Sequence, residues 1–292
     1  SNIKLEKDEN LQCTPEGQVD ELGSKTVFYF TAQKAELLSK RRLELTSNEV
    51  RQAFARYLAL PNSLADLRYR ILRPRGGRGY PLPYATTYVI ETEPDAQCLV
   101  YRLSEARHYS RPKPGKADTL LYVSHHSADL ELRQDEWVRK QIPAGKGNNA
   151  FYACDVRGTG ESRPDTCGEN SFLQPYGSDY FYAIHGIMLN RPYVGQKTLD
   201  VLQVLRWLEA AGHSRIQIVA QGWGSLPAAF AAMYSNVVTS IRLKGALDSF
   251  HSIATSQEYQ WPLSSFVPSI LNEVDLTDCY TLLKAEKDLE LL

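Results

Sequence analysis

Apolar and polar positions follow a helical spacing near the start of the chain. In residues 32–42 and 47–60 apolar side chains recur every three or four positions, which predicts two helices. Pro61 ends the second, because proline cannot continue the helical hydrogen bonds. Residues 1–23 are polar with little periodicity and are interpreted as a linker or a strap along a neighbouring surface. We therefore expect a helical N-terminal extension.

The pattern then changes to that of strands. Residues 86–91 and 98–103 alternate around Pro94-Asp95, which predicts an antiparallel hairpin. Short apolar runs at 119–124, 150–155, 216–221 and 241–247 are separated by helical patterns, notably at 199–211 and 226–234. Strands separated by helices favour a mostly parallel sheet with helices on both faces. The sequence predicts an α/β three-layer sandwich over residues 81–292, preceded by a linker and helical extension over residues 1–80.

An arginine-rich segment at residues 68–79 precedes the hairpin. A phosphate or uronate site is one interpretation, and a solvated loop is the favoured one, because neither an aromatic stacking platform nor a helix start accompanies the arginines. Over the 292 residues, 33 Lys and Arg balance 34 Asp and Glu, so no global field attracts nucleic acid or an anionic membrane. We expect neither as a partner, and any partner must be recognised locally.

Five cysteines occur without a C-x-x-C pair or a histidine at metal-ligand spacing, so neither a zinc site nor another cofactor is predicted. Buried free thiols are the favoured interpretation, and a Cys154–Cys167 bridge is the alternative. Their odd number leaves at least one thiol unpaired in the monomer. No apolar run approaches the ~20 residues that a membrane helix needs.

Three strand ends carry the candidate chemistry. The turn Ala220-Gln221-Gly222-Trp223-Gly224 joins a β-branched run to a small, apolar helix, where a G-x-S-x-G turn would carry a serine nucleophile. Ser124-His125-His126-Ser127 ends an earlier strand, and its backbone N–H groups are candidates to face a developing negative charge. Two adjacent histidines cannot point one way on extended backbone, so at most one is expected in a pocket.

The third strand end is Asp155-Val156-Arg157-Gly158-Thr159-Gly160-Glu161-Ser162. Its glycines permit a tight turn beneath the nucleophile position, and Asp155 and Arg157 are predicted to brace neighbouring loops. A phosphate cradle is disfavoured, because the third glycine and the downstream acid of a dinucleotide fingerprint are missing.

These strings, with residues 189–202 leading to Arg206-Trp207-Leu208, resemble the acetyl-xylan-esterase and dienelactone-hydrolase-like branch of the α/β-hydrolases over roughly residues 119–250. The resemblance implies hydrolysis of carboxyl esters on decorated plant polysaccharides by an extracytoplasmic bacterial protein. It also implies a serine at position 222, followed along the chain by an acid and a histidine.

The sequence departs from that pattern at the catalytic positions. Gly222 has no side chain that can attack an acyl carbon, and Ser225 is expected to face away from the apex of the turn. Asp248 suits the acid, but no histidine follows His251, and the sheet is expected to end early.

Aromatic side chains crowd residues 176–193, and they predict either a sugar-stacking cleft or, preferentially, a cap packed over the sheet or a partner. They are Tyr176, Tyr180, Phe181, Tyr182 and Tyr193, with His185 among them.

Three hypotheses for function follow. The leading one is a degenerate, non-catalytic hydrolase domain that supports or docks onto a carbohydrate-esterase-type domain. The second is an active carboxyl-ester hydrolase that is inactivated at Gly222 or uses another nucleophile, with His125 or His126 contacting the substrate and with Gln221 and Trp223 beside the pocket. The third is a carbohydrate-binding module. The expected partners are accordingly an esterase domain or a second copy of the chain, and a plant polysaccharide or acetylated sugar.

Overall fold

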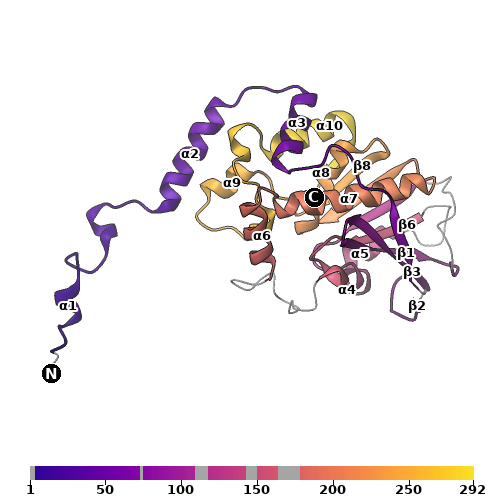
Figure 1. The fold of residues 1–292 in the computed structure, drawn as a ribbon, viewed down its shortest axis with the longest axis horizontal. Helices are drawn as coiled ribbons and strands as arrows, with labels where there is room; N and C mark the ends of the chain where they lie inside the picture. The colour runs from indigo at the N-terminus through magenta and orange to yellow at the C-terminus, as the bar shows by residue number, and fades with distance from the viewer. Residues whose placement is uncertain (1–3, 73–74, 109–117, 143–149, 164–177) are drawn as a thin grey trace.

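A twisted mixed sheet forms the centre of the molecule (Figure 1). The computed structural model describes residues 4–72, 75–108, 118–142, 150–163 and 178–292. The strand order is β1-β3-β4-β6-β5-β7-β8-β9, with β2 beside β3, and the run from β6 to β9 is parallel. The strands are β1 (Arg68–Ile71), β2 (Arg75–Gly76), β3 (Tyr84–Glu93), β4 (Ala96–Ser104), β5 (Thr119–Val123), β6 (Ala150–Asp155), β7 (Ile216–Gln221), β8 (Val238–Lys244) and β9 (Asp288–Leu291).

Helices cover both faces of this sheet, which confirms the predicted three-layer sandwich. Successive strand residues point to opposite faces, so Leu121 joins the larger core while Tyr122 joins the smaller. The larger core lies under α3 (Ser47–Tyr57), α7 (Tyr193–Ala210), α8 (Ser225–Tyr234) and α10 (Leu276–Glu286). The smaller lies under α4 (Ala128–Gln134) and α5 (Glu136–Gln141).

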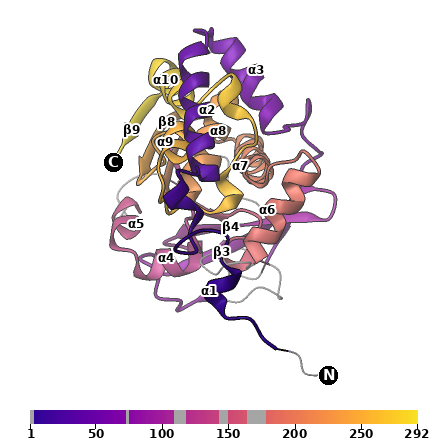
Figure 2. The same cartoon turned by 90° about the vertical axis from the view of Figure 1, so that its left-hand side faces the viewer.

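The N-terminal extension is helical, as predicted, and it projects from the body (Figures 1 and 2). It contains α1 (Asp8–Leu11), the 3-10 turn η1 (Val19–Leu22) and α2 (Val27–Arg41). Helix α2 starts five residues before the helix predicted at 32–42. The Thr26 hydroxyl caps it by accepting a hydrogen bond from the Tyr29 N–H at 3.3 Å. In contrast, α3 belongs to the body, with Phe54 buried in the larger core. The proposed boundary at residue 80 stays a prediction.

Three predictions about the sheet are wrong. Residues 68–79 are not simply a loop, because β1 and β2 pair antiparallel with β3 at the sheet edge. The sheet also continues past β8, where it was expected to end, since β9 adds a parallel strand. The β8 strand itself ends at Lys244 rather than at residue 247, because Gly245 turns the backbone with a φ of 58°.

The remaining helices are α6 (Ser178–Met188) and α9 (Phe250–Thr255), with 3-10 turns η2 (Gly160–Ser162), η3 (Gly222–Gly224), η4 (Leu263–Ser265) and η5 (Ile270–Asn272). Cys98, Cys154 and Cys279 are buried free thiols, Cys13 is exposed, and Cys167 lies outside the described residues, as does the proposed bridge to it. Among the described helices, none combines the length and the apolar character needed to cross a bilayer.

Candidate functional site

The turn after β7 keeps the backbone shape of a nucleophile-bearing turn. Gln221 ends the strand in extended conformation, Gly222 adopts a left-handed φ of 51°, and α8 begins at Ser225. A Cβ on Gly224 would lie 2.4 Å from the carbonyl oxygen of Ser124, so the turn packs against the end of β5 without room for a side chain. The Ser225 side chain is buried, and its hydroxyl donates to the Gly222 carbonyl at 2.5 Å. Ser225 therefore stabilises the turn from within.

The imidazole of His125 covers the turn. The backbone N–H of Trp223, which follows the nucleophile position, donates to His125 Nδ1 at 3.1 Å. In an α/β-hydrolase the N–H at this position is one donor of the oxyanion hole. A Cβ on Gly222 would lie 2.7 Å from the Nδ1 and Cε1 atoms of His125. The ring therefore occupies the space above the glycine and engages the N–H that a reacting oxygen would need.

Neutral histidine suits this position. Nδ1 can accept a hydrogen bond only while it is unprotonated. Burial, together with neighbouring His126, lowers the pKa of His125 to about 4, so the ring is neutral near pH 7. Burial also lowers the pKa of His126.

The two histidines lie together, although their side chains were expected to point in different directions. Their ring centroids are 3.6 Å apart, and both rings meet the indole of Trp223 edge to face, at 5.1 Å and 4.5 Å. The prediction assumed extended backbone, but the chain bends at residues 125–126, directly after β5. The bend brings adjacent side chains to one side.

The backbone N–H groups of the same loop are also occupied. Glu131 of α4 accepts hydrogen bonds from the N–H groups of His125, His126 and Ser127 at 2.7–3.1 Å. Its Oε2 accepts a further bond from the Tyr122 hydroxyl at 2.7 Å. Burial raises the pKa of Glu131, and these donors oppose the rise. The prediction that these N–H groups would face a developing charge is wrong, because a buried side chain already binds them.

Asp155, at the end of β6, is fully buried and joins the segment after β5, strand β4 and the turn after β6. Burial raises its pKa, and the surrounding donors oppose the rise. A Cβ on Gly160 would lie 2.1 Å from Asp155 Oδ2, so the turn passes directly over the carboxyl group. The donors are the Ala128 N–H at 2.7 Å, the Ser124 hydroxyl at 2.8 Å, the Tyr101 hydroxyl at 3.2 Å and the Glu161 N–H at 3.3 Å.

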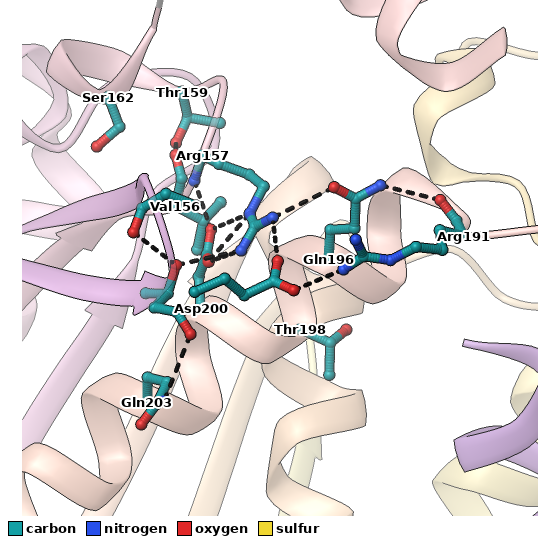
Figure 3. A network of polar contacts seen from close by, with 12 residues as sticks. Val156, Arg157, Thr159, Ser162, Arg191, Gln196, Thr198, Asp200 and Gln203 are labelled. Carbon is teal, nitrogen blue, oxygen red and sulfur yellow. Dashed lines mark hydrogen bonds and ion pairs between the residues drawn. The ribbon is translucent and has the colours of Figure 1, made fainter. Parts of the chain in front are cut away.

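Arg157 lies at the centre of a second polar network, shown in Figure 3. Its backbone N–H and guanidinium both bind the buried carboxylate of Asp200 in α7, with Nη2 2.5 Å from Oδ1. The guanidinium also donates to Glu93 Oε2 at 2.7 Å and to Thr92 Oγ1 at 3.1 Å, at the end of β3. Burial lowers the pKa of Arg157, but Asp200 and Glu93 outweigh it and the net shift is upward. These contacts tie β3, the loop after β6 and α7 together.

The other predicted site residues lie around this frame. Gly158 has a φ of 74°, and a Cβ there would lie 2.3 Å from the Tyr193 hydroxyl. Gln221 Nε2 donates to Asp135 Oδ2 at 3.0 Å, between α4 and α5. Asp248 is exposed in the loop between β8 and α9, four residues past the true end of the strand.

The aromatic residues of α6 are spread around the helix rather than gathered in a cleft. Tyr180 and Phe181 contact each other edge to face, with their ring centroids 5.7 Å apart. Phe181 is exposed, whereas the Tyr182 ring lies 5.8 Å from that of Tyr193. Tyr176 falls outside the described residues. Within the described ranges, no group of three His, Cys, Asp or Glu side chains is placed to hold a metal ion.

Sequence reasoning missed Glu131 and Asp200. Both are acidic residues on amphipathic helices, where charged side chains ordinarily face solvent. The available signal for Asp200 was the apolar surroundings of the helix pattern at 199–211, which put a lone acid on a buried face. For Glu131, the signal was its place four residues after Ser127, one turn beyond a strand end.

Comparison with solved structures identifies the fold as that of the α/β-hydrolases. A candidate acetyl xylan esterase from Bacteroides fragilis superposes with a TM-score of 0.61 at 14% identity, covering 84% of this chain and 66% of that one. Acetyl xylan esterases from Paenibacillus sp. R4 and Thermoanaerobacterium sp. are also similar, with TM-scores of 0.42 and 0.45 at 20% and 12% identity. They cover 72% and 69% of this chain, and 63% of each of those chains.

The chain thus spans just under two thirds of the length of these esterases. No protein-family model matches the chain. No curated protein matches it either. At these identities the likeness concerns the fold, so activity has to be argued from the site itself.

Proposed function

We propose that this chain is a non-hydrolytic α/β-hydrolase domain that supports or docks onto a carbohydrate-esterase-type domain. One observation carries the proposal: above a glycine at the nucleophile position, the His125 ring accepts the N–H of Trp223 at 3.1 Å. Acyl transfer needs a nucleophile and free donors for the oxyanion. Here the first is missing, and the donors on both sides of the turn are bound to His125 and Glu131.

The elbow would have to change in several places to regain activity. A serine at position 222 would meet the His125 ring, and removing that ring would still leave the loop N–H groups on Glu131. The proposal therefore predicts that replacing the glycine is insufficient.

The experiment compares hydrolysis of 4-nitrophenyl acetate by the natural chain, Gly222→Ser and Gly222→Ser/His125→Ala. We expect no turnover and no acyl-enzyme burst in any of them, with circular dichroism confirming that each is folded. Mass spectrometry after treatment with a fluorophosphonate provides an independent readout, because an activated serine would gain the phosphonyl group. Turnover by the natural chain, or burst formation by Gly222→Ser alone, would overturn the proposal.

The docking part is tested separately, by sedimentation velocity of the chain mixed with an acetyl xylan esterase from the same organism. A faster-sedimenting complex and a changed rate of acetyl release are the expected results. Unchanged sedimentation and unchanged release would count against a supporting role.

Carbohydrate binding is a second candidate, favoured by the aromatic group of His125, His126 and Trp223. All three are half-buried at the carboxyl ends of the parallel strands. Sugar rings stack their C–H faces on such aromatic surfaces. Calorimetric titration with acetylated xylo-oligosaccharides tests it, with Trp223→Ala as the matched variant. Binding heat that persists in Trp223→Ala would reject this surface as the binding site.

A further inference from the structure

The N-terminal extension offers an interaction surface that is independent of the elbow. Half of the large apolar side chains that are exposed in the described chain lie between Leu5 and Leu43. A solvent-exposed concentration of this kind marks an interaction site in soluble proteins. Two neighbouring segments carry it: the strap, defined as residues 4–23, and the outer face of α2.

The inner side of α2 is fixed to the body. Ala35 is buried there, and the helix packs against α9 and η5. Its charged side chains pair with the body as well, with Glu36 Oε1 3.5 Å from His251 Nε2 and Arg42 Nη1 3.6 Å from Asp275 Oδ2. The helix is therefore a stable platform.

The outer face of α2 is apolar and basic. Phe30 is 60% exposed, and Tyr29 and Leu37 are exposed beside it. A shallow hollow runs along this face, with Lys34 and Lys40 among the residues that line it. Residues 24–42 contain five basic side chains and one acidic side chain.

The strap has the complementary character. It runs away from the body (Figures 1 and 2), and Leu5 and Leu11 are 91% and 65% exposed. Its hydrogen bonds are local, such as that from Asn10 Nδ2 to Glu6 Oε2 at 3.0 Å. Residues 4–23 contain six acidic and two basic side chains. Strap and helix therefore match in both apolar content and sign of charge.

We propose that two copies of this chain associate by exchanging straps, so that the acidic strap of each copy lies along the outer face of α2 of the other. A two-fold arrangement uses the same pair of surfaces twice and leaves neither unpaired. It buries the exposed apolar side chains of both segments and places acidic residues opposite Lys34 and Lys40. Opposite charges at an interface rim mainly set specificity and association rate, which makes charge reversal an informative test.

The experiment measures the mass of the full chain by sedimentation equilibrium over a range of concentration and salt. We expect a concentration-dependent rise from 33.0 kDa towards twice that mass, weakened by salt. Lys34→Glu/Lys40→Glu and, separately, Asp8→Lys/Glu9→Lys should each weaken association at least tenfold in Kd. All four side chains are exposed, so the variants should remain folded.

Mixing the two variants distinguishes exchange between copies from folding back within one copy. In a mixed pair the unchanged acidic strap of one variant meets the unchanged basic helix of the other. At the second contact the lysines introduced at positions 8 and 9 face the glutamates introduced at positions 34 and 40. Mixed dimers should therefore form where neither variant dimerises alone. Lys140→Glu/Lys284→Glu, which reverses two exposed lysines outside the extension, is the matched control and should dimerise normally.

Three results would overturn the proposal. A chain that is monomeric at all concentrations would reject the proposal. This includes a monomer whose strap resists proteolysis because the strap covers its own α2. Dimers unaffected by either reversal would place the interface elsewhere, and failure of the mixed variants to pair would exclude reciprocal exchange. These outcomes do not depend on esterase activity.

Discussion

The ends of β6 and β7, the two strands that flank β5 in the sheet, differ in how they are built. The loop after β6 is densely hydrogen-bonded: Asp155 accepts four donors, and Arg157 joins Asp200, Glu93 and Thr92. The turn after β7 has the conformation of a nucleophile-bearing turn but presents a glycine and an N–H bound to an imidazole. Side chains hold the loop after β6 in place, whereas the turn after β7 presents no side chain at its apex.

The difference teaches that the shape of the turn does not depend on the chemistry it would serve. Gly224 presses against the Ser124 carbonyl, and the Ser225 hydroxyl holds the Gly222 carbonyl from below. These contacts come from backbone and packing, and a side chain at position 222 takes no part in them. A nucleophile can therefore be missing while the elbow keeps its geometry.

The largest effect is expected from breaking the braced loop. Asp200→Ala removes the buried carboxylate that binds Arg157 and leaves Arg157 and Arg191 to share Glu93, which should lower the free energy of unfolding by about 3–5 kcal/mol. Urea denaturation followed by circular dichroism measures it. The exposed pair of Glu136 and Lys140 provides the control, since Glu136→Gln should leave the free energy of unfolding almost unchanged. A loss below about 1 kcal/mol for Asp200→Ala would show that the network contributes little to stability.

The next prediction concerns the elbow itself. Gly222→Ser places a side chain at a φ of 51° and against the His125 ring, 2.7 Å from the new Cβ. The left-handed conformation alone costs about 1–2 kcal/mol for a residue with a Cβ. Gly245 is the matched control, because its φ is 58° and a Cβ there meets nothing within 4 Å. Gly222→Ser should therefore destabilise the protein more than Gly245→Ser.

A double-mutant cycle shows whether His125 causes that excess. Combined with His125→Ala, Gly222→Ser should lose the additional destabilisation, which appears as a coupling of about 0.5–3 kcal/mol. Equal effects of the two glycine substitutions would mean that the ring moves aside freely. The elbow would then be closer to a functional one than the structure indicates.

Protonation of His125 should have a smaller effect, visible as a pH dependence. The pKa of His125 is about 4 in the folded protein and has an ordinary value of 6.5. As the pH falls, the unfolded chain therefore binds this proton at a higher pH than the folded protein does. The contribution of His125 to stability is therefore constant above pH 6.5, decreases as the pH falls to about 4, and is fully lost below that. His125→Phe removes this titration and keeps an aromatic ring.

The measurement is the difference in Tm between the natural chain and His125→Phe at pH 7 and pH 4. It should shift in favour of the variant at pH 4, by roughly 2–4 °C for each kcal/mol of linkage. His126 and the buried acids titrate in both proteins and largely cancel in the difference. A Tm difference that is the same at both pH values would indicate that His125 is not held neutral.

Much of the fold could be predicted from the sequence, because its signals are local. The hairpin of β3 and β4 alternates along most of its length, and the runs that became β5, β6 and β7 are short and apolar between helical patterns. The predictions were wrong where one residue or a backbone pairing, rather than the hydrophobic pattern, decides the structure. Gly245 ended β8 early, and β9 forms from a charged segment that pairs through its backbone at the sheet edge.

The site was only half predictable. The absent serine and the bracing roles of Asp155 and Arg157 follow from the residues and their spacing. The position of His125 over the turn does not, because it depends on a bend and on contact with a segment almost a hundred residues away. The capture of loop N–H groups by Glu131 is likewise a tertiary contact that no linear pattern encodes.

The smallest effect is expected at the exposed edge of the Arg157 network. Its size shows whether the exposed pair contributes to the stability of that network. Arg191 pairs with Glu93 Oε1 at 2.6 Å, but its side chain is 46% exposed (Figure 3). Exposed pairs contribute about 0–1 kcal/mol, so Arg191→Gln should lower the free energy of unfolding by less than about 1 kcal/mol. The same urea titration measures it. A loss approaching that of Asp200→Ala would mean that the network acts as one unit, because Glu93 would then need both arginines to stay paired.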